Sequence, residues 1–346
     1  MPFKEDSKFK VQDSRFISGL IYVLPFAAAW VALFLGAYGV SPSMVLRVLG
    51  GVVFPFFDPG DVAEKAIILD IRLPRVLLAG LTGMALAGAG VTLQGVFRNP
   101  LVDPFILGIS AGASLGCALS IGFFPSWPIQ IMAFIFGLGA VAVTFSAAKM
   151  QGEISRLPLI LAGVIVSAFF TAMVSIVKFL VDPMKLQSIV FWLMGSFALA
   201  DWRMVWIAGG GVLAGLLPVF LMRWRLNVMS MGDDEARTLG IHLRRDRLIL
   251  IVGSSLAVSL AVSVSGIIGW VGLMVPHLVR MLRGPDHRAL VPQSIMGGAA
   301  FMIFADTIAR NLTGFDIPVG IITAILGAPF FVFLMRKGGR ENWGRA

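Results

Sequence analysis

Few side chains in this sequence could do covalent or metal chemistry, and they form no catalytic pattern. The histidines are His242, His277 and His287, and the single cysteine, Cys117, allows no intrachain disulfide. His277 lacks carboxylate or thiol companions, so we expect a structural role for it at a helix end. There is no H-E-x-x-H motif, no serine nucleophile motif and no G-x-x-x-x-G-K-[ST] phosphate-binding loop. We therefore expect no enzyme activity, no resident metal or cofactor, and no ATP hydrolysis by this chain itself.

Carboxylates that could bind a coupling ion are scarce within the apolar segments. Proton- and sodium-driven transporters keep such groups near the bilayer centre. Asp306 comes closest, and Arg310 follows four residues later, so an ion pair at a helix end is the expected role. A charge at the bilayer centre costs roughly 2.5–3.5 kcal/mol, which this sequence largely avoids. The energy for transport should therefore come from another protein, which favours a permease driven by a separate ATPase.

The elements that position these residues are long apolar segments. The chain is 58% hydrophobic and 14% charged, and about 20 apolar residues suffice to cross a bilayer. The sequence predicts an all-α polytopic membrane protein with one domain, residues 1–346, and about ten transmembrane helices. The predicted spans are 16–40, 74–97, 101–121, 127–148, 157–181, 202–222, 248–266, 268–282, 290–310 and 317–335.

Lys and Arg are distributed unevenly around these spans. Threading from an inside N-terminus places 20 of the 28 basic residues on one side or at its boundary, and cytoplasmic loops are the ones enriched in Lys and Arg. Both termini, including a tail at 1–15, are therefore predicted to be cytoplasmic. These loops and their contact with anionic membrane lipid explain the net charge of +9, so nucleic acid is not an expected partner.

Two connections are long enough to have structure of their own. The extracytoplasmic connection, 41–73, is apolar but interrupted by two glycines and Pro55, which predicts a short interfacial helix. The cytoplasmic loop, 223–247, contains an acidic run that begins a short helix-like segment ending at Gly240. Such a helix at the membrane surface could bind another protein; a solvated loop is the alternative.

Glycines recur within the predicted spans. The stretch 80–90 reads GLTGMALAGAG, and Gly108, Gly112 and Gly116 form a stripe at helical spacing. Small residues let helix backbones approach closely, so we expect these segments to be tightly packed. Spans 74–97 and 268–282 both pair a glycine-rich stretch with a proline and polar groups at the inside end, which suggests an inverted five-helix repeat.

Four long segments are distinctive: RLPRVLLAGLTGMALAGAGVTLQGVFRNPLVDPFILGISAGASLG, GDDEARTLGI, SGIIGWVGLMVPHLVRMLRGPDHRALVP and ADTIARNLTGFDIPVGIITAILGAPFFVFLMRK. They resemble the corresponding segments of one known family, the FecCD-type permeases, which are the membrane subunits of bacterial ABC importers for ferric siderophores, haem and cobalamin. The resemblance covers nearly the whole chain. It implies ten helices per subunit, a second permease subunit (a homodimer), two cytoplasmic subunits that bind ATP and Mg, an extracytoplasmic binding protein, and the cytoplasmic membrane of a bacterium or archaeon.

The resemblance also implies roles for particular residues. Arg72, Arg75 and Arg310 match arginines that meet acidic residues of the binding protein; local pairs with Asp70 and Asp306 are the alternative. The residues that match the coupling segment in the ATPase cleft are Asp233, Glu235, Ala236, Arg237, Leu239 and Gly240. The segment 157–200 resembles the pathway lining. Its candidate residues are Ser155 as a gate, and Ser167, Thr171, Ser175 and Met194 along the pathway.

The function predicted from these observations is inward transport of a metal chelate by a permease subunit powered by separate ATPases. The alternative from another class is an ion-coupled secondary transporter that acts alone. A membrane-embedded enzyme is disfavoured because no catalytic constellation is visible. The sequence does not separate siderophore, haem, cobalamin or another metal complex as cargo.

Overall fold

The computed structural model describes residues 5–36, 38–54, 61–148, 156–313 and 315–338, and throughout these residues the regular structure is helical. The helices are α1 (Glu5–Phe34), α2 (Pro42–Val53), α3 (Val62–Lys65), α4 (Leu73–Phe97), α5 (Ile109–Gly122), α6 (Ile129–Ala148), α7 (Arg156–Leu180), α8 (Pro183–Leu193), α9 (Trp202–Met231), α10 (Asp233–Thr238), α11 (Leu243–Ser265), α12 (Val271–Arg283), α13 (His287–Asn311) and α14 (Val319–Gly338). A π-helical segment, Ala66–Arg72, joins α3 to α4, and a 3-10 turn, Pro104–Leu107, precedes α5.

Helix α4 is the central helix of the bundle, and its glycines explain why it fits there. It is buried along almost its whole length between α9, α11, α12 and α13. A Cβ atom at Gly83 would overlap the carbonyl oxygen of Gly298 in α13, and one at Gly90 would overlap that of Gly272 in α12. Only residues without a side chain allow such close backbone contact. The expected tight packing of the 80–90 stretch is therefore confirmed.

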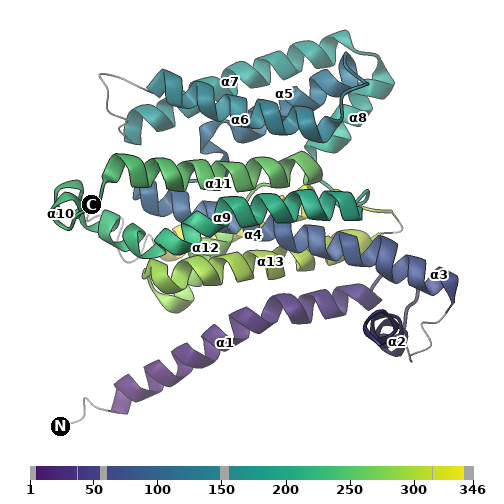
Figure 1. The fold of residues 1–346 in the computed structure, drawn as a ribbon, viewed down its shortest axis with the longest axis horizontal. Coiled ribbons are helices and arrows are strands. Elements are labelled where there is room, and N and C mark those ends of the chain that lie inside the picture. The colour runs from purple at the N-terminus through teal and green to yellow at the C-terminus, as the bar shows by residue number, and fades with distance from the viewer. Residues whose placement is uncertain (1–4, 37, 55–60, 149–155, 314, 339–346) are drawn as a thin grey trace.

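Two further layers flank this centre (Figure 1). Helices α5 to α8 lie on one side, where α5 packs closely against α6: a Cβ at Gly112 or Gly116 would overlap a carbonyl oxygen of α6. A second apolar cluster, which includes Val174 of α7 and Ile189 of α8, holds that layer together. Helix α1 lies on the opposite side of the bundle and packs mainly against α13.

The predicted spans agree with the helices. Each of the ten overlaps one helix, in order α1, α4, α5, α6, α7, α9, α11, α12, α13 and α14. Within the described residues, six helices are long and apolar enough to cross a membrane by length and composition alone. The fold class, an all-helical membrane protein with several spans, is confirmed, whereas the count of ten crossings, the side of the termini and the inverted repeat stay predictions.

Some boundaries differ from the prediction for local reasons. Span 101–121 becomes α-helical only at Ile109, because Pro104 begins a 3-10 turn and Gly108 adopts a left-handed conformation (φ 86°). Helix α9 continues nine residues beyond the predicted end at 222, because residues 223–231 contain no glycine or proline and Gly232 is the next one. Much of the predicted loop 223–247 is therefore helical. The interfacial helix expected in 41–73 corresponds to α2.

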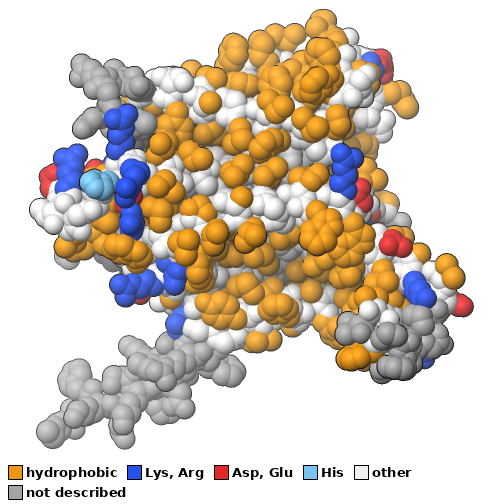
Figure 2. Space-filling view, in the orientation of Figure 1, with side chains coloured by type: hydrophobic (Ala, Val, Ile, Leu, Met, Phe, Trp, Pro, Cys, Tyr) orange, Lys and Arg blue, Asp and Glu red, His pale blue; other side chains and the backbone are white. Residues whose placement is uncertain are grey.

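Charge divides the molecule into two unlike ends. Most of the basic side chains visible in Figure 2 gather at the end that carries α10, while hydrophobic side chains cover the surface between the ends. The start of α1 lies toward this α10 end, and α2 and α3 lie at the opposite end (Figure 1). We call these the α10 end and the α2 end.

Candidate functional site

A six-residue helix held by two arginines is the main feature of the α10 end. Helix α10 follows α9 with only Gly232 between them. Asp233 accepts hydrogen bonds from Arg98 Nη2 and from Arg247 Nη2, each at 2.8 Å. Arg98 lies at the end of α4 and Arg247 in the first turns of α11. One carboxylate therefore connects α10 to two long helices, and we call this arrangement the Asp233 clamp.

The backbone at Arg98 directs its side chain into this clamp. Arg98 adopts a left-handed conformation, φ 52° and ψ 37°, which is uncommon for a residue other than glycine and ends α4. Its Nε also donates to the carbonyl oxygen of Met229 in α9, at 2.6 Å. The guanidinium of Arg98 thus joins the end of α4 to both α9 and α10.

The predicted coupling residues divide into an inward and an outward set. Ala236 is fully buried, and Asp233 is directed to the arginines of its own chain. Gly240 is exposed and ends the segment in a left-handed conformation (φ 77°). The other exposed residues of the predicted set are Glu235, Arg237 and Leu239. An exposed leucine among charged side chains suits a surface that a second protein covers.

A second charged cluster lies at the α2 end, inside the protein. Arg75 donates to both carboxylate oxygens of Asp306 at 3.0–3.1 Å, and its Nη1 donates to Asp316 at 2.8 Å. Arg75 and Asp306 are 8% and 2% exposed. This bidentate geometry is the strong form of an ion pair, and it ties the start of α4 to the end of α13.

The two other arginines of this cluster bind carbonyl groups of the segment around the end of α1. Arg72 donates to the carbonyl oxygens of Leu33, at 2.7 Å, and of Tyr38. Arg310 donates to that of Ala32, and its Nε lies 4.0 Å from Asp306. Arg72 and Arg310 are also buried. Together the three arginines stabilise the junction of α1, α4 and α13.

A π-helical segment ends at Arg72, directly before α4. The N–H of Leu73 bonds to the carbonyl of Ile68, five residues back. Pro74 has no N–H, so the ordinary four-residue pattern is interrupted at this point. Arg72 and Arg75 are three residues apart, so their side chains lie on the same side of the helical segment.

These arginines are buried and already have partners within the chain, and their direct contact with a binding protein stays a prediction. Their guanidinium groups bond within their own chain, which fits the alternative of local pairing. Of the two local partners named in that alternative, Asp306 bonds to Arg75 and lies 4.0 Å from Arg310, whereas Asp70 is exposed and takes part in none of the described ion pairs. Asp316 was not foreseen as a partner.

The predicted pathway residues lie on the layer formed by α5 to α8. On α7, Thr171 and Ser175 are exposed and Ser167 is partly exposed; the Ser175 hydroxyl donates to the carbonyl of Thr171 at 3.1 Å. Met194, after α8, is 37% exposed. Ser155 lies outside the described residues. Only 28% of the most apolar stretch of α7 is buried, against 83% of the corresponding stretch in the helix that contains α4. Much of α7 is therefore available to a partner or to the bilayer.

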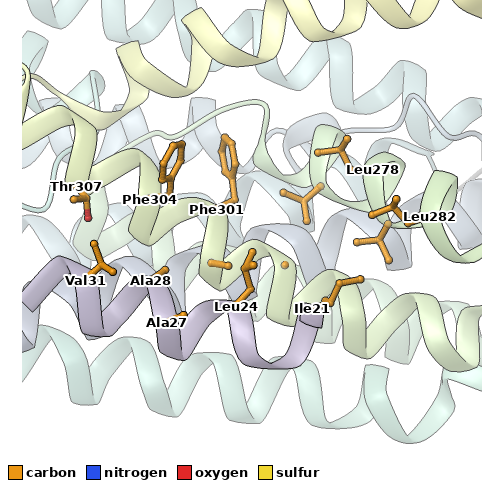
Figure 3. A pocket seen from close by; sticks show the side chains of 14 residues that line it. Ile21, Leu24, Ala27, Ala28, Val31, Leu278, Leu282, Phe301, Phe304 and Thr307 are labelled. Carbon is orange, nitrogen blue, oxygen red and sulfur yellow. The ribbon is translucent and has the colours of Figure 1, made fainter. Parts of the chain in front are cut away.

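An apolar groove of about 540 Å³ lies between α1, α12 and α13 (Figure 3). Leu24, Leu282 and Phe301 are typical of its lining. The hydroxyl of Thr307, at one end, donates to the carbonyl of Ile303 at 2.7 Å, so it is already satisfied. The groove has no group that would bind a charged cargo, and its character suits the hydrocarbon of a bilayer.

No group of three or more His, Cys, Asp or Glu side chains that could hold a metal ion occurs among the residues the structure describes. Cys117 is fully buried in α5.

The fold and these surfaces define a class of protein: a helical, multi-span membrane protein with a short helix displayed at its basic end. The chain belongs to the FecCD transport family, whose family model matches residues 24–337. It is a permease subunit, and permeases of this kind work in transporter complexes with ATPase and binding-protein partners.

Individual relatives agree over most of the chain. An iron chelatin transport system permease protein of Helicobacter pylori (strain 26695) is 46% identical, over 78% of this chain and 82% of its own length. The molybdate import system permease protein MolB of Haemophilus influenzae is 38% identical, over 95% and 98%. A solved chain of a metal-chelate type ABC transporter, in an inward-facing conformation, superposes with a TM-score of 0.83 at 38% identity and covers 93% of this chain and 99% of that one.

Proposed function

We propose that this chain is one of two identical permease subunits of an importer that moves a metal chelate, such as a ferric siderophore, haem or cobalamin, into the cell. The observation that carries this proposal is the Asp233 clamp. A helix of six residues is too short to be stable alone, yet α10 is fixed to α4 and α11 and exposes Glu235, Arg237 and Leu239. Such a rigid, exposed element suits a contact through which an ATPase moves the bundle.

The proposed orientation is that of the positive-inside rule, with the α10 end and both termini in the cytoplasm of a bacterial or archaeal cell and the permease in its cytoplasmic membrane. The α2 end then meets the binding protein. There the buried arginine cluster would maintain the shape of the docking surface, in place of the direct contact implied by the resemblance.

The cargo pathway in this proposal runs between two copies of the chain, along the exposed face of α7. Ser167, Thr171, Ser175 and Met194 are its proposed lining residues, and Ser155 its proposed gate. Names of relatives include both an iron chelatin and molybdate permease, so the binding protein, which selects the cargo, is the component to assay for specificity.

Uptake by liposomes tests this function. The permease is reconstituted with its ATPase subunits and with the binding protein loaded with labelled chelate. We expect accumulation that requires ATP, stops with vanadate and persists when ion gradients are collapsed. Accumulation by the permease alone, driven by a proton or sodium gradient, would establish the secondary transporter instead.

A further inference from the structure

A polar pocket of about 300 Å³ opens at the α10 end where α4, α9, α12 and α13 meet. Its lining includes two guanidinium groups, those of Arg98 and Arg280, together with His287, Asn99 and Ser230. Its described lining contains no carboxylate. The local charge is therefore positive, which favours an anion.

The two arginines differ in how their charge is balanced. Arg98 is paired with Asp233 in the clamp. Arg280 donates from Nη2 to the amide oxygen of Gln94 at 2.8 Å, while its Nη1 is buried without a partner. No carboxylate of the described residues forms an ion pair with Arg280. A sheltered cation without a counter-charge is unfavourable. Because the described residues supply no anion to Arg280, we expect it to bind an anionic ligand.

His287 adds a hydrogen-bond acceptor to the pocket. The neighbours of the ring determine which of its two nitrogens accepts. The backbone N–H of His287 donates to the amide oxygen of Asn227 at 2.8 Å, so this oxygen is an acceptor. Nδ1 lies 2.9 Å from the same oxygen and must therefore carry the proton. Asp286 holds Asn227 in this orientation by accepting from its amide nitrogen at 2.6 Å.

The other ring nitrogen, Nε2, then carries the lone pair. His287 is 7% exposed, and Nε2 has no partner. A Cβ at Gly95, which also lines the pocket, would lie 2.8 Å from Nε2. The nitrogen therefore faces the space that Gly95 leaves open.

A ligand that fits must offer a negative oxygen to Arg280 and a donated proton to His287. A hydrogen phosphate has both, and planar guanidinium groups bind phosphate oxygens well. We propose that this pocket binds a phosphate group, with Arg280 as its main cationic partner, Arg98 at its edge and His287 Nε2 as acceptor. The phosphate is that of free inorganic phosphate or of a phospholipid headgroup; the phosphodiester of a headgroup has no proton, so its ammonium or hydroxyl group would donate to Nε2 instead. Because Arg98 also belongs to the Asp233 clamp, the bound group would influence how firmly α10 is held.

The experiment uses the full-length permease in detergent, stripped of lipid, and calorimetric titration with inorganic phosphate. A second arm measures co-purified phospholipid by native mass spectrometry. Saturable phosphate binding identifies the free ion, and retained phospholipid identifies the headgroup; either supports the site if the variants below respond.

Arg280→Gln should weaken binding of the phosphate source at least about tenfold, as expected for loss of a charged hydrogen-bond partner. Arg288→Gln is the matched control, because Arg288 is exposed, lies outside the pocket lining and gives the same charge change. At the exposed position 230, Ser230→Asp should abolish binding and Ser230→Ala should retain it. Wild-type protein that binds neither source, or equal binding by Ser230→Asp and Ser230→Ala, would overturn the proposal.

Discussion

Removing the carboxylate of Asp233 should release α10 from the bundle. Asp233→Ala eliminates the 2.8 Å hydrogen bonds from Arg98 and Arg247 at once. A hydrogen bond to a charged group contributes about 1.5–3 kcal/mol where it is sheltered. The Asp233 side chain is 39% exposed, so solvent screening reduces the contribution of the whole clamp to about 1–2 kcal/mol. That corresponds to roughly a 5–30-fold change in the ratio of held to released α10.

Hydrogen exchange of the peptide containing 233–240 measures this ratio directly. We expect exchange of its amides to accelerate by roughly 5–30-fold in Asp233→Ala, with α4 and α11 unchanged, and coupled uptake to fall. Asp234→Ala is the matched control: its side chain is 94% exposed and its described ion pair, with Arg237, is long at 3.8 Å. Equal exchange rates in the two variants would refute the idea that Asp233 holds the helix.

Other predictions concern stability and follow from single contacts. Asp306→Ala leaves Arg75 buried without its bidentate partner and should cost about 3–5 kcal/mol, seen as a lower thermal unfolding temperature in detergent, whereas exposed Asp70→Ala should have no effect. Arg75→Glu should likewise destabilise the permease. If this variant instead folds normally and loses only its affinity for the binding protein, Arg75 contacts that protein directly. Gly83→Ala forces a Cβ onto the Gly298 carbonyl and should lower the unfolding temperature; Gly210→Ala, which meets nothing within 4 Å, should not. Asp182→Ala removes the cap that accepts from Met184 and Lys185 at 3.0 Å and should cost about 1 kcal/mol, detected as faster hydrogen exchange at the start of α8.

The features that could be predicted from the sequence are those set by local composition. Apolar length predicts the spans, and the glycines of 80–90 predict the tight packing of α4, because a missing side chain is a property of the residue itself. Even the acidic start and the glycine end of α10 follow from capping preferences. Its boundaries were therefore close to the observed Asp233–Thr238.

Two ion pairs of these clusters, Arg98 with Asp233 and Arg75 with Asp316, could not be predicted because their partners are far apart in the chain. Arg98 and Asp233 are separated by 135 residues, and Arg75 and Asp316 by 241. The pair favoured by helical spacing, Asp306 with Arg310, is long at 4.0 Å, because Arg75 occupies the carboxylate of Asp306 instead. Helical spacing brings residues near each other, but packing between helices decides which one makes the bond.

Helix α4 connects the two charged clusters, and this connection bears on how the permease could transmit force. Arg75 lies in its first turn and Arg98 directly follows its last. At 1.5 Å per residue the 25 residues of α4 extend about 38 Å, more than the roughly 30 Å hydrocarbon core of a bilayer. Because Gly83 and Gly90 lock α4 against the backbones of α13 and α12, α4 has little freedom to bend independently. A displacement of α10 would therefore be transmitted through the Asp233 clamp to α4, which would move as a rigid body and displace the arginine cluster. A flexible connection at either end of α4 would weaken this transmission. In the proposed mechanism the two clusters would have complementary roles: the Asp233 clamp would receive the movement, and the arginine cluster fixes the far end of the same helix to α1 and α13.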